Sequence, residues 1–276
     1  MSADAPEPLL TCREHEAMRA AVNAGASTLE CSLDLGCSMT TLELDGGGWR
    51  WRGRRFPFLE VCKERTIYYW TGAAFEPAAR FTTSLVKLVP TVWGPPTFEI
   101  DGVKMLPTLR VSPYADAANK VSLIQPGGKT ILDTCAGLGY FAAWCLKEGA
   151  ARVRSFEKNA DVLWLRSLNP WSPPPSERLT LTNSDIAQEI GKLPAQSFDA
   201  VLHDPPRFGL AGELYSQAFY DHLARVLRRK GRLFHYTGTP NKLTTGRDVP
   251  REVAQRLRRA GLSAELSGDG VLCAKQ

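Results

Sequence analysis

Residues 131–141 read ILDTCAGLGYF and join an apolar run, a carboxylate and two closely spaced glycines. The apolar run predicts a buried strand, and the residues from Tyr140 onward predict a helix. Gly137 and Gly139 stand where the strand must turn sharply into that helix, and a glycine lets the backbone approach a ligand because it has no Cβ. With Ala142 the run also matches G-x-G-x-x-A, a pattern that is weak alone, because a purely structural turn can carry it.

Predicted strands and helices alternate from about residue 113 onward. The predicted strands are TILDTC, ARVRSFE, RLTLTN, FDAVLHD and RLFHYTG, and the helices between them include GELYSQAFYDHLARVLRRKG at 212–231. Such alternation predicts a parallel sheet with right-handed crossovers. Residues 262–275, LSAELSGDGVLCAK, predict a closing antiparallel hairpin that would insert a final strand at the sheet edge.

The first hundred residues have a different texture. Short apolar or alternating runs are separated by Gly, Pro and Asp, which predicts strands and turns. We therefore expect two domains: a small β-rich N-terminal domain at 1–112, for which a substrate-binding or lid role is open, and a Rossmann-like catalytic domain at 113–276. Within the first, GGGWRWRGRRF at 46–56 interleaves Arg and Trp. This pattern fits either a base-stacking surface or an edge strand with alternating faces.

The composition is that of a folded globular protein, since 43% of the 276 residues are hydrophobic. No uncharged apolar run is long enough to cross a membrane, and MSADAPEPLL lacks the basic start and apolar stretch of a secretory signal, so we expect a cytoplasmic protein with no membrane partner. The seven cysteines include no C-x-x-C pair, and the four histidines are not spaced to complete a zinc site with them. We expect neither a metal nor a disulfide.

The net charge of +5 comes from the C-terminal half. RVLRRKGR at 225–232 and REVAQRLRRAG at 251–261 carry much of the excess. Each predicts an amphipathic helix that shows its arginines to water, and the alternative is a surface for nucleic acid or another anionic partner.

Three further carboxylates fall at or just beyond the carboxyl ends of predicted strands, where ligands bind in open α/β sheets. Glu157 follows Asp133 by 24 residues, which is the usual interval to an acid that accepts both ribose hydroxyls, so we expect an adenosine-type ribose. Asp185 fits either an acceptor for an adenine amine, with Ile186 packing on the ring, or a helix N-cap. Asp204 is the third.

LDTCAGLGY, Glu157, Asp185 and HDPPRF together resemble the nucleotide-binding half of class I S-adenosylmethionine-dependent methyltransferases over roughly residues 113–276. The resemblance implies a mostly parallel seven-stranded sheet with a C-terminal antiparallel hairpin, and S-adenosylmethionine as cofactor. SLDLG, LDTCAGLGY, LNPWS, HDPPRFGLAGELYS and GRLFHYTG resemble more closely a family of predicted methyltransferases common in archaea, and that likeness extends into the N-terminal region. It brings no substrate with it.

The resemblance, read with the residues themselves, gives a set of candidate cofactor-binding positions. The acid and glycines of the first motif would face the methionine part, the acid of the second strand would bind ribose, and the end of the third would meet adenine. Tyr114, ahead of the first strand, fits either a cap on the cofactor or loop packing. The set is Tyr114, Asp133, Cys135, Gly137, Gly139, Tyr140, Glu157, Lys158, Asp185, Ile186 and Asp204.

HDPPRF, residues 203–208, suits an amine nucleophile, because two prolines remove backbone donors and stiffen a loop whose carbonyls can face the site. In the amino-methylating branch of the family an aromatic residue fills the fourth place of this motif. Here Arg207 stands there and Phe208 follows, which puts base stacking in doubt. The guanidinium could pair with a carboxylate or phosphate of the substrate, or bridge to a neighbouring acid.

The candidate catalytic residues gather around this loop. His203 and His235 end neighbouring predicted strands and could accept a proton, although a core or helix-packing role is the simpler interpretation for each. Tyr140, Tyr215 and Tyr236 could face the cationic sulfonium, although packing is the simpler role for any one tyrosine. Adjacent residues of a strand point to opposite faces, so His235 and Tyr236 should not share one site. The catalytic candidates are Asp204, Pro205, Arg207, His203, His235 and Tyr236.

The function expected from these features is methyl transfer from S-adenosylmethionine to a nitrogen or other heteroatom nucleophile of a small metabolite or RNA. One alternative keeps the cofactor but uses its 3-amino-3-carboxypropyl arm, by transfer or by cyclisation, and releases methylthioadenosine. A second alternative is a non-catalytic RNA-binding module. No DNA specificity is evident, and the sequence predicts no oligomeric state.

Overall fold

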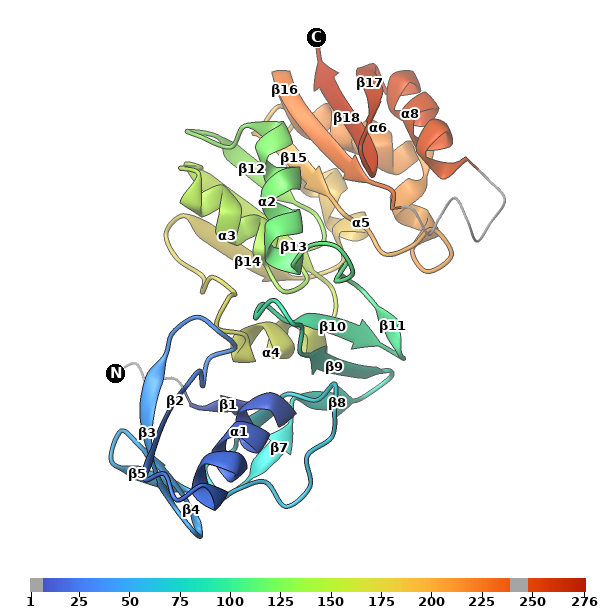
Figure 1. Ribbon diagram of the computed structural model, residues 1–276. Helices are drawn as coiled ribbons and strands as arrows, with labels where there is room; N and C mark the ends of the chain where they lie inside the picture. The colour runs from blue at the N-terminus through green and yellow to red at the C-terminus, as the bar shows by residue number, and fades with distance from the viewer. Residues whose placement is uncertain (1–6, 239–247) are drawn as a thin grey trace. The chain divides into compact units, whose positions relative to one another are not determined.

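The computed structural model describes residues 7–238 and 248–276 (Figure 1), and the chain divides into two compact units. One unit comprises residues 1–113 together with 164–171, and the other comprises 114–163 together with 172–276. The segment 164–171 therefore packs with the N-terminal residues, although the sequence pattern assigned it to the C-terminal domain.

The described residues of the first unit form three small antiparallel sheets and the helix α1 (Cys12–Asn23), and the unit also includes residues 164–168 of helix α4 (Ala160–Leu168). The helix starts with a capping box in which Thr11 and Glu14 bond reciprocally. The sheets run in the orders β1-β6-β7, β2-β3-β4-β5 and β11-β10-β9-β8. Their strands are β1 (Leu9–Leu10), β2 (Thr28–Cys31), β3 (Thr40–Asp45), β4 (Gly48–Trp51), β5 (Arg54–Phe56), β6 (Tyr68–Trp70), β7 (Phe75–Pro77), β8 (Ala79–Phe81), β9 (Leu85–Val89), β10 (Thr97–Ile100) and β11 (Val103–Lys104).

The Arg/Trp stretch of residues 46–56 forms the β4–β5 hairpin of this unit. Trp49 is fully buried and stacks on Phe56 with 4.5 Å between ring centroids, and the indole N–H of Trp51 donates to Thr40. Trp49 is thus used in packing, as the strand interpretation required, whereas Trp51 is half-buried with Arg52 over its ring.

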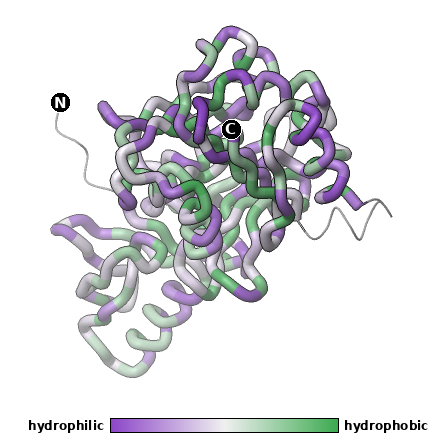
Figure 2. Tube along the Cα trace, turned by 90° about the horizontal axis from the view of Figure 1, so that it is seen from above, coloured by the Kyte–Doolittle hydropathy of each residue, from purple (hydrophilic) through white to green (hydrophobic). Residues whose placement is uncertain are grey.

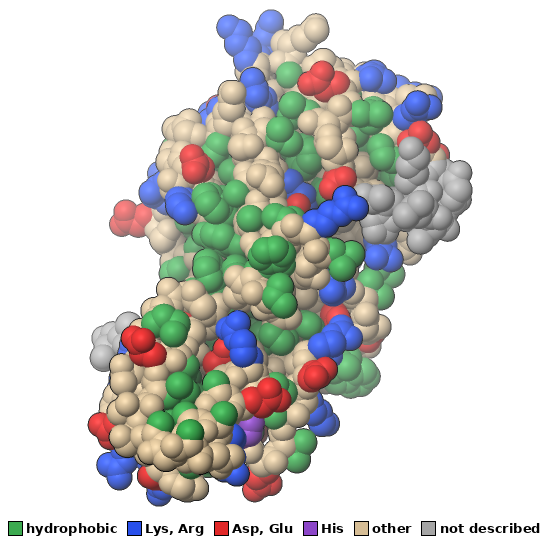
Figure 3. All heavy atoms as spheres, viewed as in Figure 1, with side chains coloured by type: hydrophobic (Ala, Val, Ile, Leu, Met, Phe, Trp, Pro, Cys, Tyr) green, Lys and Arg blue, Asp and Glu red, His purple; other side chains and the backbone are tan. Residues whose placement is uncertain are grey.

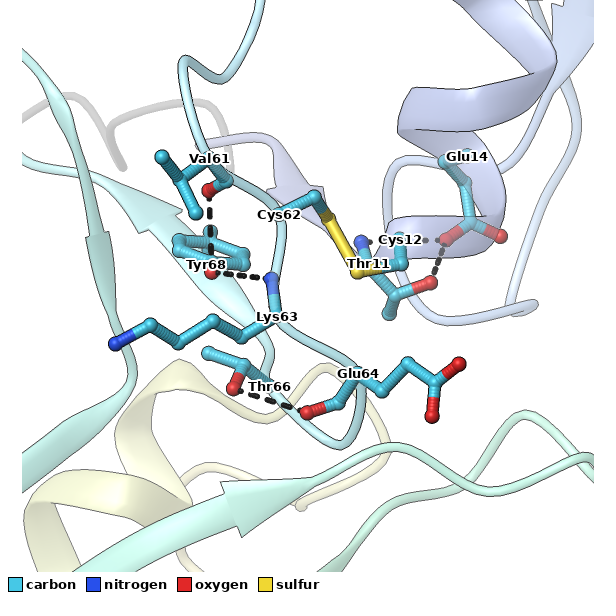
Figure 4. Close-up of a disulfide and its surroundings, with 9 residues drawn as sticks. All are labelled: Thr11, Cys12, Glu14, Val61, Cys62, Lys63, Glu64, Thr66 and Tyr68. Atoms are coloured by element: carbon cyan, nitrogen blue, oxygen red, sulfur yellow. Dashed lines mark hydrogen bonds between the residues drawn. A yellow bond between two sulfur atoms is a disulfide. The ribbon is translucent and has the colours of Figure 1, made fainter.

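Cys12 and Cys62 form a disulfide that ties the start of α1 to the loop ahead of β6 (Figure 4), so the expectation of no disulfides was wrong. Their Cα atoms are 5.5 Å apart although the residues are 50 positions apart in the sequence. A pairing made by tertiary structure leaves no short spacing to recognise, which is why the search for C-x-x-C missed it.

The second unit contains the seven-stranded sheet that the sequence predicted, in the order β14-β13-β12-β15-β16-β18-β17. The first five strands are parallel, and β18 pairs antiparallel with both β16 and β17, which inserts the last strand of the chain between two others. This is the Rossmann-like methyltransferase fold with its closing hairpin. The strands are β12 (Thr130–Asp133), β13 (Arg152–Glu157), β14 (Leu179–Asn183), β15 (Phe198–His203), β16 (Leu227–Tyr236), β17 (Leu262–Ser267) and β18 (Gly270–Lys275).

Helices cover both faces of this sheet, with a separate apolar core on each face. Val121 of α2 and Cys145 of α3 belong to one core, and residues of α5, α6 and α8 belong to the other. The helices are α2 (Pro113–Ile124), α3 (Tyr140–Lys147), α4 (Ala160–Leu168), α5 (Ile186–Glu189), α6 (Gln217–Val226) and α8 (Val249–Arg259), with short 3-10 helices η1 (Ile190–Lys192) and η2 (Gly212–Tyr215).

One predicted boundary in this unit was wrong. The helix expected over 212–231 ends at Val226, and Leu227 already pairs with Phe198 in the sheet. Lys230 has a positive φ of 62°, which no helix tolerates. Pairing of the buried Leu227 with its neighbouring strand therefore outweighs the helical pattern of this stretch.

In residues 7–238 and 248–276, no helix is both long and apolar enough to cross a membrane. Figure 2 shows why, because the apolar stretches of the trace are short and are interrupted by hydrophilic residues.

Candidate functional site

The glycine turn and the end of β13 are joined by hydrogen bonds to one carboxylate. Gly137 donates its backbone N–H to Oε2 of Glu157 at 2.9 Å, and Asn159 donates to Oε1 at 2.9 Å. Both glycines have positive φ, 50° at Gly137 and 82° at Gly139, where Gly139 caps α3. The turn therefore needs glycine for its backbone, and it fixes Glu157 at the carboxyl edge of the sheet.

Asp133 and Cys135 flank the start of this turn. Asp133 is 1% exposed and accepts a hydrogen bond from the hydroxyl of Ser155 at 2.9 Å, which joins β12 to β13. Burial raises the pKa of the Cys135 thiol well above its usual range, and the nearby Glu157 charge raises it further. Cys135 is thus a protonated thiol at neutral pH and is no nucleophile.

Tyr114 and Tyr140 pack on each other between α2 and α3. Their ring centroids are 5.5 Å apart in an edge-on arrangement, and the indole N–H of Trp144 donates to the carbonyl of Tyr114 at 2.7 Å. Tyr140 is 4% exposed. The geometry matches the packing alternative for both tyrosines, and it does not present Tyr140 as a face for a sulfonium.

The residues after β13 and β14 are placed as follows. Asp185 caps α5 and accepts from the backbone N–H of Ala187 at 2.9 Å, so the N-cap alternative is observed, and Ile186 is buried. Lys158 lies at the surface, with Nζ 3.7 Å from Oε1 of Glu213. Contacts of these residues with a cofactor stay predictions.

Both candidate histidines are core residues, which corrects their assignment as bases. Nδ1 of His203 lies 2.7 Å from the hydroxyl of Thr134, and its Nε2 lies 3.1 Å from the carbonyl of Leu214. Nε2 of His235 lies 2.9 Å from the hydroxyl of Tyr220, and its Nδ1 lies 2.9 Å from the carbonyl of Tyr236.

Burial lowers the pKa of both imidazoles, well below the usual range for His203 and to about 4 for His235. At neutral pH both are uncharged and have both nitrogens in hydrogen bonds. Neither can take a proton from a substrate without losing one of them. Tyr236 packs against the apolar core that contains Val121, whereas the adjacent His235 contacts Tyr220 of the core on the opposite face, as the alternation of side chains along a strand predicted.

A buried lysine joins the loop after β15 to the end of β16, and the sequence analysis missed it. Nζ of Lys120 in α2 lies 2.8 Å from Asp116, 3.5 Å from Asp204 and 3.5 Å from the ring centroid of Tyr236. The lysine side chain is 7% exposed, and each aspartate side chain is 17% exposed. We call Asp116, Lys120, Asp204 and Tyr236 the acid–lysine cluster.

The signal for this cluster was present but weak. Asp116 and Lys120 stand at i and i+4 in the predicted helix SPYADAANKVSLI, a spacing that places them on one face. A lysine within a mostly apolar helix next to the first strand is a residue that needs a partner. That Asp204 is the partner follows only from the tertiary structure.

Opposing effects set the ionisation of the cluster. Burial raises the pKa of Asp204, Lys120 lowers it, and Asp116 raises it, with a net rise above the usual range of a carboxyl. Burial lowers the pKa of Lys120, but Asp204 and Asp116 outweigh this and the net direction is upward. Burial raises the pKa of Tyr236 to about 12. At neutral pH, Lys120 is therefore an ammonium and Tyr236 a neutral phenol.

The diproline loop is only partly as expected. Pro205 is buried, and the carbonyl of Pro206 accepts from the hydroxyl of Tyr215 at 3.1 Å, so that carbonyl is not held toward the site. Phe208 is half-buried and packs edge-on against Tyr215, with 5.4 Å between ring centroids, and Tyr215 itself is 1% exposed. Arg207 is exposed.

Arginines of the two basic clusters bond to the protein's own backbone. Arg225 donates to the carbonyls of Leu193 and Ile190, and Arg256 donates to the carbonyl of Tyr215. Arg228 and Arg258 do the same elsewhere. On the face shown in Figure 3, the Lys and Arg side chains are scattered among Asp and Glu. The second cluster lies in α8 as expected, whereas residues 227–232 of the first lie in strand β16, so the expected helix there was wrong. Several arginines of both clusters are engaged with the protein's own backbone.

A cavity of about 680 Å³ lies away from the site. Its lining includes Gln125 and Lys129, which precede β12, and Trp144 of α3. Ligands of such sheets bind at the carboxyl ends of the strands, so this cavity is not the candidate site. Within the described parts of the chain, no group of three His, Cys, Asp or Glu residues could hold a metal ion.

Comparison with known proteins places the chain in a family. No protein-family model matches it. The uncharacterized protein MJ1233 of Methanocaldococcus jannaschii is 42% identical to it over 200 residues, which make up 72% of this chain and 68% of that protein. The chain belongs to the family of this archaeal protein. Because the second unit holds only a little over half of the chain, the family likeness extends into the first unit, as the sequence motifs predicted.

Solved structures show the fold of this family member. A spermidine synthase in complex with the transition state analogue AdoDATO matches with a TM-score of 0.57 at 14% identity, over 71% of each chain. The spermidine synthase of Thermotoga maritima matches with a TM-score of 0.55 at 15% identity, over 71% of this chain and 70% of that one. The strand order and these matches confirm the expected fold class.

Proposed function

We propose that this protein is an S-adenosylmethionine-dependent transferase that acts on a nitrogen nucleophile of a small molecule. One observation carries the proposal. β12 and β15 are neighbours in register, with Asp133 opposite Leu202, so the glycine turn and the loop that begins at Asp204 leave the sheet side by side. A cofactor on the turn would then lie next to the carboxylate of Asp204.

The residues at the edge of the sheet fit the adenosine part of this cofactor. A carboxylate offers about four acceptor positions, so the two backbone bonds of Glu157 are compatible with further bonds from ribose hydroxyls. Gly137 and Gly139 would let the backbone approach the methionine part. Ile186 would pack on adenine from the end of β14. When bound, the cofactor supplies a sulfonium whose carbon substituents are open to displacement.

Asp204 is the group that we assign to the acceptor. An amine enters from water mostly as its ammonium ion, which has no lone pair, so a proton must leave before the nitrogen can attack. Asp204 accepts that proton, and its raised pKa suits it to the task. The new bond joins nitrogen to the transferred carbon, the C–S bond breaks, and its electron pair neutralises the sulfonium.

A small acceptor is favoured over RNA by the state of the arginines. Arg225 and Arg256 are engaged with backbone carbonyls, so the basic clusters offer less free charge to phosphates than the sequence suggested. The same observation weakens the non-catalytic RNA-binding alternative.

The group transferred is methyl in our leading proposal, and the three-carbon arm of the cofactor is the second candidate. The spermidine synthase match covers 71% of the chain, more than the second unit alone, and it favours keeping transfer of the 3-amino-3-carboxypropyl arm in the test. Incubation with S-adenosylmethionine and a panel of amines, followed by mass analysis, separates them. Adenosylhomocysteine signals methyl transfer, and methylthioadenosine signals use of the arm. Absence of both products with all amines would contradict the proposal.

A further inference from the structure

The acid–lysine cluster has an unbalanced charge. It contains two carboxylates and one ammonium, and all three side chains are largely withdrawn from water. Buried charges are normally paired, because an uncompensated charge in a region of low dielectric is costly. With both aspartates ionised, the cluster carries one net negative charge, and no further cation pairs with it among the residues of the second unit that the structure describes.

A purely structural ion pair would need only part of this arrangement. Asp116 already pairs with Lys120 one turn along α2 at 2.8 Å, which is sufficient to neutralise the lysine. Asp204 adds a second carboxylate at 3.5 Å, and it comes from the loop next to the glycine turn. The remaining exposure of both aspartates, 17% each, leaves them accessible from the solvent side.

On the basis of the function proposed above, we infer that Lys120 is a positioning residue for Asp204, and that the acceptor nitrogen enters the acid–lysine cluster as an ammonium ion that balances its second carboxylate. The acceptor class is therefore an aliphatic amine that is protonated in solution. Arg207 is exposed at the surface, so we do not count its positive charge among the groups of the cluster that the ammonium ion would meet.

The geometry gives each member a distinct task. Lys120 lowers the pKa of Asp204 against the effect of burial, and it keeps its own proton because two carboxylates hold it. The ring of Tyr236 holds the Lys120 ammonium from one side, at 3.5 Å from its centroid. That ring face is therefore taken, which replaces its expected contact with a sulfonium. The acceptor's proton passes to Asp204, so the cluster is neutral once the amine has been deprotonated and stays bound.

The groups that face Asp204 come from three elements. Asp116 and Lys120 belong to α2, Tyr236 ends β16, and the thiol of Cys135 follows β12. Tyr236 and Cys135 stay uncharged near neutral pH, because burial raises the pKa of both. Among the described residues, the charged neighbours of Asp204 that variants can remove are therefore the two α2 residues.

The first test titrates Asp204 directly and needs no turnover. The protein is labelled with ¹³C at its aspartate carboxyls, and Asp204→Asn identifies the signal in NMR spectra recorded against pH. In Lys120→Met we expect the midpoint to rise by about 1–3 pH units, because an opposite charge beside the carboxyl is lost. In Asp116→Asn/Lys120→Met the midpoint should lie between that of Lys120→Met and that of the wild type. Lys192→Met, which removes an exposed ion pair with Glu189, should leave it unchanged.

The second test asks which charge the site accepts. The probes are n-butylammonium and butyrate, added to protein saturated with adenosylhomocysteine and followed by chemical shifts and calorimetry. We expect saturable binding of n-butylammonium only. Asp204→Asn should weaken this binding about tenfold or more, since a bond to a charged group is lost.

Two results would overturn the inference. One is an unchanged Asp204 titration in folded Lys120→Met, and the other is binding of butyrate in preference to n-butylammonium. If Lys120→Met does not fold, two other variants decide whether Lys120 affects the titration of Asp204. Asp116→Asn/Lys120→Met retains the single net negative charge, and Lys120→Arg should keep the wild-type midpoint. If both tests hold but no cofactor product forms with any amine, the proposed transfer is wrong while the ammonium site stands.

Discussion

Gly137 and Glu157 are joined by a hydrogen bond of 2.9 Å from the backbone of the first to the carboxylate of the second. The bond connects the turn after β12 to the end of β13, so one carboxylate shapes the turn and also stands where a ribose would lie. Loss of this side chain should therefore act on the cofactor site as a whole.

Glu157→Ala should weaken cofactor binding by about 1.5–3 kcal/mol, because charge-assisted bonds to ribose and the support of the turn are both lost. Calorimetric titration with S-adenosylmethionine measures the change. Glu157→Gln keeps one acceptor oxygen, so its affinity for the cofactor should lie between those of Glu157→Ala and the wild type. Glu148→Ala, which removes an exposed glutamate after α3, is the control. Equal affinity of Glu157→Ala and wild type would remove Glu157 from the site.

Asp204→Asn should lower kcat by about 10²–10⁴-fold while leaving cofactor affinity within about threefold, because the group acts on the acceptor as a general base. The pH profile adds a second check. The pKa of Asp204 is raised, so activity should be full above that pKa and should be lost as the pH falls through it, at a pH above the usual carboxyl range. Parallel losses of turnover and cofactor binding would instead indicate a folding role.

His235 should make folding stability depend on pH. Its pKa is lowered to about 4 in the folded protein, and it accepts a hydrogen bond from Tyr220 only when it is neutral. The unfolded chain takes up a proton near pH 6.5, so this contribution is complete above that pH and is lost as the pH falls towards 4. The loss amounts to about 3 kcal/mol.

Denaturant unfolding between pH 7.5 and 4 measures this slope. His203, whose pKa is also lowered by burial, adds to it in the same direction. In His235→Gln the slope should become shallower, although stability at pH 7.5 also falls. A slope identical to that of the wild type would show that the imidazole is not held neutral.

Reduction of the Cys12–Cys62 disulfide should destabilise the first unit by about 2–4 kcal/mol, because the bond closes a long loop in the unfolded chain. Thermal unfolding with and without a reductant measures this effect. Cys12→Ser/Cys62→Ser should unfold at the temperature of the reduced wild type and should not respond to reductant. Cys37→Ser, at an exposed free thiol, should behave as wild type. An unchanged transition on full reduction would show that the bond adds nothing.

Local patterns predicted the strands, the glycine turn and the closing hairpin of the second unit, although not the end of helix α6. The strand, glycine turn and helix at 131–141 and the hairpin at 262–275 lie where the sequence placed them, because periodicity and glycine are short-range signals. The carboxyl-edge acids follow from the same pattern, since parallel strands end at one edge. Their position could therefore be predicted, whereas their partners could not.

Partners that lie far apart in the sequence were beyond such patterns. Lys120 and Asp204 meet through the packing of α2 on the sheet, and Cys12 and Cys62 meet through the fold of the first unit. The histidines show the same limit from the other side. Their position at strand ends suggested catalysis, but both are buried and hydrogen-bonded to the hydroxyls of Thr134 and Tyr220.

The segment 164–171 has a consequence for how the chain is made. The indole N–H of Trp171 donates to the carbonyl of Leu35 at 3.0 Å, and the ring of Trp164 packs against Tyr69 and Arg80. The N-terminal unit thus obtains part of its packing from residues that the ribosome adds only after the first two strands of the large sheet. During synthesis the first unit therefore cannot complete its packing until Trp164 and Trp171 have been added to the chain.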